Sequence, residues 1–378
     1  MRLEQSKWSV HEGWVPQGPG SLGVSPQLVL MFGSTEIFKS KREFEVVKKA
    51  YPKAHYVGCT TSGEIYGTQV NDESLVVTAI EFEHSKIRGA KVAVKGGDSY
   101  QAGIDLAQQL LGEDLVHVFV LSDGLNVNGT ELVKGLAERL PAGVNITGGL
   151  SGDGTAFKET YVMLDDEPET GKIAALGIYG DRIKIGYGSL GGWDSFGPER
   201  HVTKSEGNVL YELDGQSALD LYKKYLGDQA AGLPSSGLLF PLSIKIETES
   251  RPIVRTLLAV NEKDHSMTFA GDVPKGAIAQ LMKANFNRLV DGAVGAAKTS
   301  YQAVGSETPD LAILISCVGR KLVLKQMIEE EVEGVRDVLG DKATLAGFYS
   351  YGEISPFTPG AKCELHNQTM TITTFSEK

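Results

Sequence analysis

Three segments of the chain follow one plan: an apolar strand, a polar loop, an amphipathic helix, a second short strand and a glycine-rich turn. The first strand residue and the turn glycine lie at similar separations in Leu28 to Gly58, Val116 to Gly148 and Leu311 to Gly347. This near-constant spacing predicts one supersecondary unit used three times, at about 27–83, 115–179 and 310–375. Because helices alternate with strands, we expect a mixed α/β fold of repeated β-α-β units in mixed sheets.

Helix signals recur within these units. Ser40 and Glu43 have the spacing of a capping box, so a helix is expected from about Ser40. Asn128 is the expected N-cap of the helix in the second unit, and Gly340 the expected C-terminal cap in the third. A further long helix is expected from about 275 to 299.

The length of 378 residues favours two domains. The run Gly-Leu-Pro-Ser-Ser-Gly at 232–237 is typical of a linker or loop and predicts a boundary nearby. We expect an N-terminal extension over 1–25, a first domain over 26–230 and a second over 231–378.

Charge and composition narrow the classes of function. Lys and Arg total 37 against 48 Asp and Glu, and a formal charge of -11 disfavours a nucleic-acid partner. The N-terminus lacks the apolar core of a signal peptide, and no apolar stretch approaches the roughly 20 residues that a bilayer requires. Three cysteines, Cys59, Cys317 and Cys363, form no disulfide framework. We therefore expect a cytoplasmic protein that neither enters a membrane nor binds nucleic acid.

Several long motifs in order resemble the FIST family, with its N-terminal and C-terminal FIST domains, from about residue 26 to 375. The motifs are VGCTTSGEIYG at 57–67, LSDGLNVNGTELVKGL at 121–136, TGGLSGDG at 147–154, GNVLYELDGQSALDLYKKYLG at 207–227, SCVGRKLVL at 316–324, GFYSYGEISP at 347–356 and HNQTMT at 366–371.

The resemblance implies an intracellular sensory module that binds a small ligand, amino acids being one suggestion. Some members of the family that this sequence resembles bind haem, sense nitric oxide and regulate histidine kinases or cyclic-di-GMP enzymes. The sequence has no kinase, cyclase or receiver segment attached. The expectation is therefore a sensor, not an enzyme, that acts on a separate signalling partner.

The glycine-rich turns carry the candidate ligand-binding residues. Their glycines would let a ligand reach backbone N–H groups, their hydroxyls would add hydrogen bonds, and their acids could meet an ammonium group. The alternative is that the turns only close each unit and that the acids are solvated or paired locally. The residues are Thr60, Ser62, Glu64, Ser151, Asp153, Tyr349, Ser350 and Glu353.

Loops at the ends of strands add Asp123, Ser316 and Arg320, because ligands of α/β sheets favour the carboxyl ends of strands. Arg320 could clamp a carboxylate, or it could form a structural ion pair. We expect the residues Glu64, Ser151, Asp153, Ser350, Glu353 and Arg320 to surround no more than two concave sites.

Haem is the cofactor that the family resemblance allows. The chain lacks the Cys-x-x-Cys-His sequence of covalent attachment, but non-covalent haem needs only one axial histidine and an apolar pocket. His366, within the HNQT motif, and His117, inside an apolar strand, are the candidates. The alternative is that both are core histidines. Cys363 and His366 alone do not make a zinc site.

Two rival functions stay open. A hydrolase or transferase could use the loop Ser, Thr and acidic residues, although no Gly-x-Ser-x-Gly motif supports it. A ligand-free interaction scaffold is the other. The Gly-Tyr-Gly-Ser-Leu-Gly run at 186–191 is not expected to bind a dinucleotide, since the residues after it cannot begin a helix.

Overall fold

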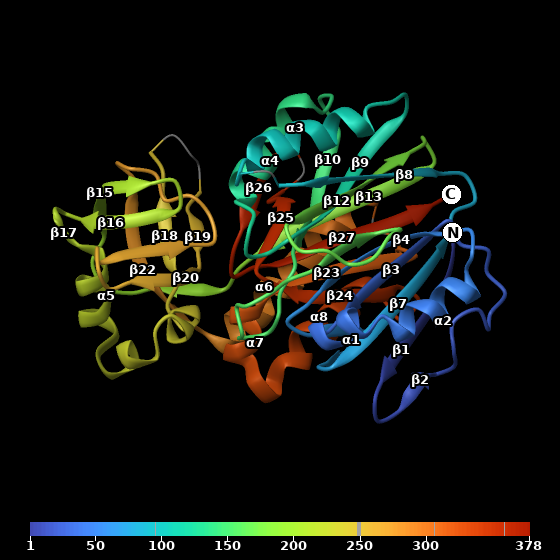
Figure 1. The fold of residues 1–378 in the computed structure, drawn as a ribbon, viewed down its shortest axis with the longest axis horizontal. Helices are drawn as coiled ribbons and strands as arrows, with labels where there is room; N and C mark the ends of the chain where they lie inside the picture. Colours follow the sequence, from blue (N-terminus) through green and yellow to red (C-terminus); the bar gives the residue numbers. More distant parts are fainter. Residues whose placement is uncertain (95, 248–250, 306, 359) are drawn as a thin grey trace.

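The computed structural model describes residues 1–378 except 95, 248–250, 306 and 359. The described residues form a body of three six-stranded sheets and a smaller unit built on a nine-stranded sheet. The smaller unit lies to the left of the body in Figure 1.

Each body sheet contains a parallel strand pair joined through helices, with an antiparallel strand beside the first strand of the pair. The strand orders are β4-β3-β7, β10-β9-β12 and β24-β23-β27. This common order confirms the predicted repetition of β-α-β units. The parallel strands are β3 (Leu28–Gly33), β4 (His55–Thr60), β9 (Leu115–Ser122), β10 (Asn145–Leu150), β23 (Leu311–Cys317) and β24 (Thr344–Ser350); the antiparallel ones are β7 (Ser74–Glu81), β12 (Lys172–Tyr179) and β27 (Met370–Glu377).

The connecting helices cover the outer faces of these sheets. They are α1 (Thr35–Ser40) and α2 (Arg42–Ala50), α4 (Gly129–Arg139), and α7 (Val318–Leu324) and α8 (Ile328–Leu339) with the short η3 (Lys325–Met327) between them. Asn128 caps α4 by accepting from the amides of Thr130 and Glu131, and Gly340 ends α8 at φ 85°, both as predicted. The expected start at Ser40 is wrong, because Ser40 ends α1 and Lys41, at φ 58°, separates α1 from α2.

A fourth strand extends each sheet: β1 (Arg2–Ser9), β8 (Lys86–Ala93) and β13 (Ile183–Leu190). Helices α3 (Ser99–Leu110) and α6 (Phe286–Ala303) pack on the second and third sheets. Residues 1–25, expected as an extension, thus supply β1 and β2 (Gly13–Val15) of the first sheet. Strand β1 pairs with β7 along its whole length.

The three units exchange strands in a closed ring. The strand that follows each turn leaves its own sheet and pairs with the next one: β5 (Glu64–Tyr66) with β24, β11 (Val162–Leu164) with β4, and β25 (Gly352–Pro356) with β10. Strands β6 (Gln69–Asn71) and β26 (Cys363–His366) pair with β5 and β25. Each unit therefore completes its neighbour's sheet.

Burial on both faces explains the apolar runs of the central strands. Along β3, Val29 and Met31 pack under α1 and α2, whereas Leu30 and Phe32 face a core that all three sheets share. Phe119 of β9 and Ile313 of β23 face the same shared core. Strands covered on both faces need continuous apolar sequence instead of strict alternation.

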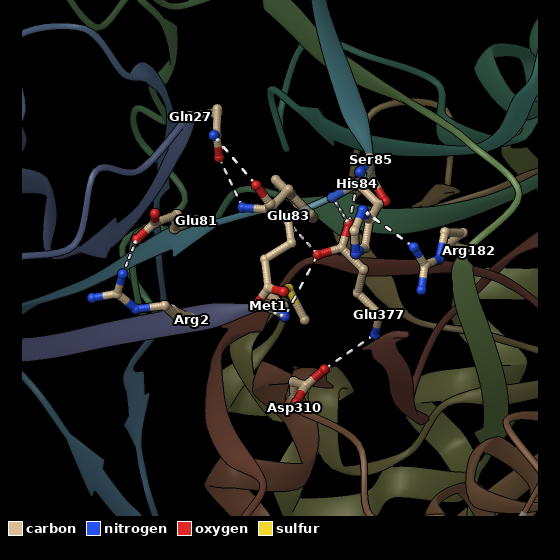
Figure 2. Close-up of polar contacts among 11 residues, drawn as sticks. Met1, Arg2, Gln27, Glu81, Glu83, His84, Ser85, Arg182, Asp310 and Glu377 are labelled. Carbon is tan, nitrogen blue, oxygen red and sulfur yellow. Dashed lines mark hydrogen bonds and ion pairs between the residues drawn. The ribbon is translucent and has the colours of Figure 1, made fainter.

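The ends of the strands opposite the turns are also tied together (Figure 2). Glu377, at the end of β27, accepts hydrogen bonds from the amides of Glu83, His84 and Ser85 at 2.7, 3.0 and 2.7 Å. Burial alone would raise the pKa of Glu377, but these bonds and the Ser85 hydroxyl lower it to about 2. The link between the first and second units is thereby fixed to the third.

The smaller unit is inserted between β13 and α6, which both pack against β27 of the third unit. Its elements are β14 (Trp193–Ser195), β15 (Arg200–Glu206), β16 (Val209–Leu213), β17 (Gln216–Ser217), α5 (Ala218–Leu226), η1 (Gly227–Gly232), η2 (Ser235–Leu239), β18 (Leu242–Lys245), β19 (Ile253–Arg255), β20 (Leu257–Asn261), β21 (Ser266–Phe269) and β22 (Ile278–Ala284). The expected boundary near residue 230 falls inside this unit. The helix expected from about 275 is wrong at its start, since β22 precedes α6 and Asn285 caps that helix.

Candidate functional site

The three turns meet in a ring of backbone hydrogen bonds. Each bond joins two different units: Ser62 N to Tyr349 O at 2.8 Å, Gly152 N to Thr60 O at 3.0 Å and Tyr351 N to Leu150 O at 3.2 Å. The turns that the sequence singled out therefore lie together where the three units converge.

A cleft of about 910 Å³ opens beside this ring, between the first and second units. Ser62, Glu64 and Asp153 are the predicted residues that line it. Its other polar lining includes Ser34 and Thr61, which belong to the predicted strand-end loop and first turn. The remaining polar residues of the lining were not predicted: Thr35, Glu36, Asp72, Glu73, Lys158 and Glu159. Acidic side chains outnumber basic ones, so the cleft favours a cationic ligand.

Glu64 is the most perturbed acid of this cleft. It accepts hydrogen bonds from the Thr61 hydroxyl, and from the hydroxyl and amide of Ser74 at 2.6 and 3.1 Å. Burial raises the pKa of Glu64 to about 7, although these bonds and the nearby Lys321 oppose the rise. An ammonium group brought to this carboxyl would stabilise its ionised form.

The cleft also has a buried hydroxyl without a partner in the described part of the chain, that of Thr35, and a lysine from another unit at its edge, Lys321. The Thr35 hydroxyl is buried and has no hydrogen-bond partner among the described residues. Lys321, from α7 of the third unit, donates to the Ser62 carbonyl at 2.9 Å and pairs with Asp72. A buried hydroxyl without a partner calls for a water or a ligand.

Asp153 shapes the wall of the cleft. Its carboxylate accepts from the amides of Phe157, Lys158 and Glu159 at 2.9, 2.8 and 3.0 Å, and from the Tyr351 hydroxyl. The Ser62 hydroxyl accepts from the Gly154 amide at 3.1 Å. These contacts fold the second turn against the first.

Glu353 repeats the surroundings of Glu64 in the third unit. It accepts from the Ser350 hydroxyl at 2.6 Å, and from the Thr369 hydroxyl and amide at 3.0 and 3.2 Å. Burial raises its pKa to about 8. The smaller unit covers the segment next to Thr369, where Gln368 bonds to the Leu238 carbonyl and to the Trp193 indole. Glu353 and Ser350 are therefore buried, away from the cleft.

The remaining predicted hydroxyl and acid groups hold the turns in place. Thr60 accepts from the Tyr161 amide, and Ser151 donates to the Ser122 carbonyl, each at 3.0 Å. Asp123 accepts from the amides of Leu125, Asn126 and Gly171 at 2.8, 2.8 and 2.7 Å. All three predicted residues are buried. Their contacts therefore match the alternative in which the turns close each unit and bind no ligand.

Arg320 forms a buried ion pair with Glu331, at 2.6 Å. The hydroxyls of Ser316 and Tyr349 donate to the other oxygen of the same carboxylate, at 3.1 and 2.7 Å. Both side chains of the ion pair are fully buried and do not line the cleft. Arg320 is thus a structural residue and not a clamp for a ligand, which corrects the first of its two interpretations.

Family models identify the chain. A model described as the FIST N domain matches residues 27–216, and one described as the FIST C domain matches residues 218–356. The chain belongs to the FIST family. FIST domains are generally sensory domains that bind small ligands in signalling proteins.

The relatives found by sequence and by structure are distant. An uncharacterized protein of Methanocaldococcus jannaschii is 24% identical over 340 residues, covering 83% of this chain and 64% of the relative's length. Two solved structures of cyanuric acid hydrolases, one from A. caulinodans, are each 8% identical, cover 100% of this chain and 99% of their own, and have TM-scores of 0.40 and 0.32.

The two histidines proposed as haem ligands do not fit that role in this FIST chain. His117 Nε2 bonds to the Thr147 hydroxyl at 2.8 Å, and burial lowers the pKa of His117 to about 3. His366 Nε2 bonds to the Ser355 carbonyl at 2.7 Å, and burial lowers its pKa to about 4. Both rings are buried. The void beside Phe375, whose ring contacts that of His117, holds only about 20 Å³. Ligand pockets need about 300 Å³ or more.

The described residues contain no group of three or more His, Cys, Asp and Glu side chains placed to hold a metal ion. Within the same residues, every helix is too short or too polar to cross a bilayer.

Replacing Glu353 with glutamine is expected to reduce the loss of stability as pH rises. With its pKa raised from 4.5 to about 8, the folded state keeps a proton that the unfolded chain releases, so stability falls between these values. At about 1.4 kcal/mol per pKa unit, this loss is on the order of 5 kcal/mol. Glutamine has the shape of the protonated acid and carries no charge.

Urea unfolding at pH 5, 6.5 and 8.5 measures the difference. Glu353→Gln should match the parent at pH 5 and exceed its stability at pH 8.5 by roughly 4 kcal/mol. Glu36→Gln, whose side chain is 86% exposed, is the control and should follow the parent throughout. If the free energy of unfolding depended on pH in the same way for Glu353→Gln and the parent, ionisation of Glu353 would not destabilise the fold.

Proposed function

We propose that this protein is a cytoplasmic sensor that binds a small amino-acid-like molecule through its ammonium group in the cleft beside the turns. Membership of the FIST family supports a sensory role. The position of Glu64 carries the proposal, since a carboxyl with a pKa near 7 lines a cleft of ligand size.

The ligand class follows from the groups around Glu64. Glu36, Asp72, Glu73 and Glu159 add negative charge to the cleft, and Lys158 is the positive group of its lining. The hydroxyl of Thr35 offers a further hydrogen bond. A primary ammonium flanked by polar groups satisfies both the acids and the hydroxyl.

The signal is proposed to pass to a separate partner, such as a histidine kinase or a cyclic-di-GMP enzyme. Lys321 connects the rim of the cleft to α7, and α7 packs against η2 of the smaller unit. A ligand that displaces Lys321 from Asp72 would therefore change the contacts of α7 in the third unit and, through α7, those of the smaller unit. Haem-based sensing of nitric oxide would need a histidine other than His117 or His366.

Replacing Glu64 with glutamine is expected to weaken ligand binding at least tenfold. Thermal-shift screening of the twenty amino acids and 1,4-diaminobutane would identify a binder, and titration calorimetry would measure its affinity. Affinity for the parent should rise as pH increases through about 7, where Glu64 ionises. Glutamine cannot acquire this charge, so the pH dependence should disappear.

Glu353→Gln is the matched control, because Glu353 has the same kind of partners but lies away from the cleft. It should bind with the affinity of the parent. Equal affinities of the parent and Glu64→Gln would exclude Glu64 as the ammonium partner. If no compound in the screen bound, the proposal that the cleft binds an amino-acid-like ammonium compound would be wrong.

A second candidate function is a hydrolase or transferase, and one contact favours it. The Thr61 hydroxyl donates to Glu64, which is the arrangement of a nucleophile and a base. Prolonged incubation of each screened binder with the protein, followed by NMR, would reveal turnover. Unchanged spectra would leave binding as the function.

A further inference from the structure

A second cleft, of about 800 Å³, lies between the body and the smaller unit. Helix α4 and β26 of the body line it on one side, and β19 and Ile246 of the smaller unit on the other. The smaller unit lies beside α4 and β26 in Figure 1. Apolar side chains from both sides line it: Val133, Leu140, Ile146 and Leu365 from the body, and Ile246 and Ile253 from the smaller unit.

Arg255 lines this cleft, although the residue is only 3% exposed. Its Nε donates to the Asp272 carbonyl at 3.0 Å, and its Nη1 to the carbonyls of Leu365 and Val254 at 3.0 and 3.4 Å. Among the described residues, no carboxylate lies within ion-pair distance of Arg255, and Nη2 has no hydrogen bond. A buried cation is costly unless it is paired, so this group calls for an anion.

Nearby acids have other partners. Asp272 accepts from the Asn128 side chain at 2.9 Å, and Glu138 accepts from the Tyr100 hydroxyl. Glu364 also has an interaction of its own. Asp272 and Glu364 act on Arg255 from a distance, while burial lowers the pKa of Arg255 to about 10. The guanidinium therefore stays charged at neutral pH.

We propose that this cleft binds a small carboxylic acid with an apolar tail. The carboxylate would accept hydrogen bonds from Nη2 of Arg255, and the tail would lie between Val133 and Ile146 on one side and Ile253 on the other. Because the walls belong to different units, the bound acid would hold the smaller unit against the body. This site is separate from the cleft at Glu64 and does not depend on the function proposed there.

Sodium octanoate, with octan-1-ol as its uncharged match, tests the proposal by titration calorimetry on the full chain. Octanoate should bind at least tenfold more tightly than octanol. Arg255→Lys should weaken octanoate at least tenfold, since a single ammonium group cannot replace Nε and Nη1 at the Asp272 and Leu365 carbonyls and also reach the carboxylate. Glu64→Gln should leave octanoate affinity unchanged, which separates this cleft from the first.

Ala137→Phe is the second variant, because Ala137 lines the cleft from the exposed face of α4 and its enlargement should not disturb the core. The added ring should obstruct the tail and lower octanoate affinity at least tenfold, even if Arg255→Lys fails to fold. Equal affinities for octanoate and octanol would overturn the proposal. Unchanged octanoate affinity in Ala137→Phe would overturn it as well, because the acid would then bind elsewhere.

Discussion

Replacing Arg320 with methionine is expected to destabilise the protein by about 3–5 kcal/mol, the usual cost of removing one partner of a buried ion pair. The loss leaves Glu331 as an uncompensated charge with only the hydroxyls of Ser316 and Tyr349. Two carbonyls that Arg320 now satisfies, those of Gly191 and Leu289, would lose a donor. Urea unfolding at pH 7 measures the change.

The double variant Arg320→Met with Glu331→Met should recover part of the loss, since it removes the stranded charge. Lys134→Ala is the surface control, because Lys134 pairs with Glu131 while 65% exposed and should change stability by less than about 1 kcal/mol. A loss in Arg320→Met as small as that of Lys134→Ala would contradict the assigned ion pair.

Replacing Gly347 with alanine is expected to cost several kcal/mol or to prevent folding. A Cβ at this position of β24 would lie 1.9 Å from the Leu314 carbonyl oxygen in the paired strand β23. Backbone cannot move aside as a flexible side chain can, so β23 and β24 would have to separate. Thermal unfolding and the yield of folded protein are the measurements.

Gly18→Ala is the matched control, because its Cβ would meet nothing within 4 Å. It should unfold within a degree or two of the parent. Gly58 and Gly148, at the equivalent places of the other units, would approach the Met31 and Val120 carbonyls to 2.3 and 1.8 Å. If Gly347→Ala is as stable as Gly18→Ala, close approach of strands is not why these glycines recur.

These glycines show where sequence reasoning succeeded and where it failed. Their spacing revealed the repeated unit, and the strand order confirmed it. Their chemical reason was different from the expected one, since Gly58, Gly148 and Gly347 admit a neighbouring strand and not a ligand. A sequence pattern shows that space is needed but does not show what occupies it.

The candidate site was predictable only in part for a similar reason. Glu64, Ser62 and Asp153 were found because they follow a recurring turn, and they line one cleft. Glu353 has the same local pattern as Glu64, but a distant segment, including Leu238, covers the end of its turn. Lys321 reaches the cleft from another unit, which no local pattern could indicate.

The exchange of strands determines the order in which the sheets can be completed during synthesis. Strand β10 leaves the ribosome long before β25, its partner, and the β5–β6 hairpin long before β24. The emerging chain therefore carries unpaired sheet edges until the third unit appears, and such edges readily join other chains. Chaperone binding to the nascent protein should be concentrated in this interval and end when β24 and β25 emerge.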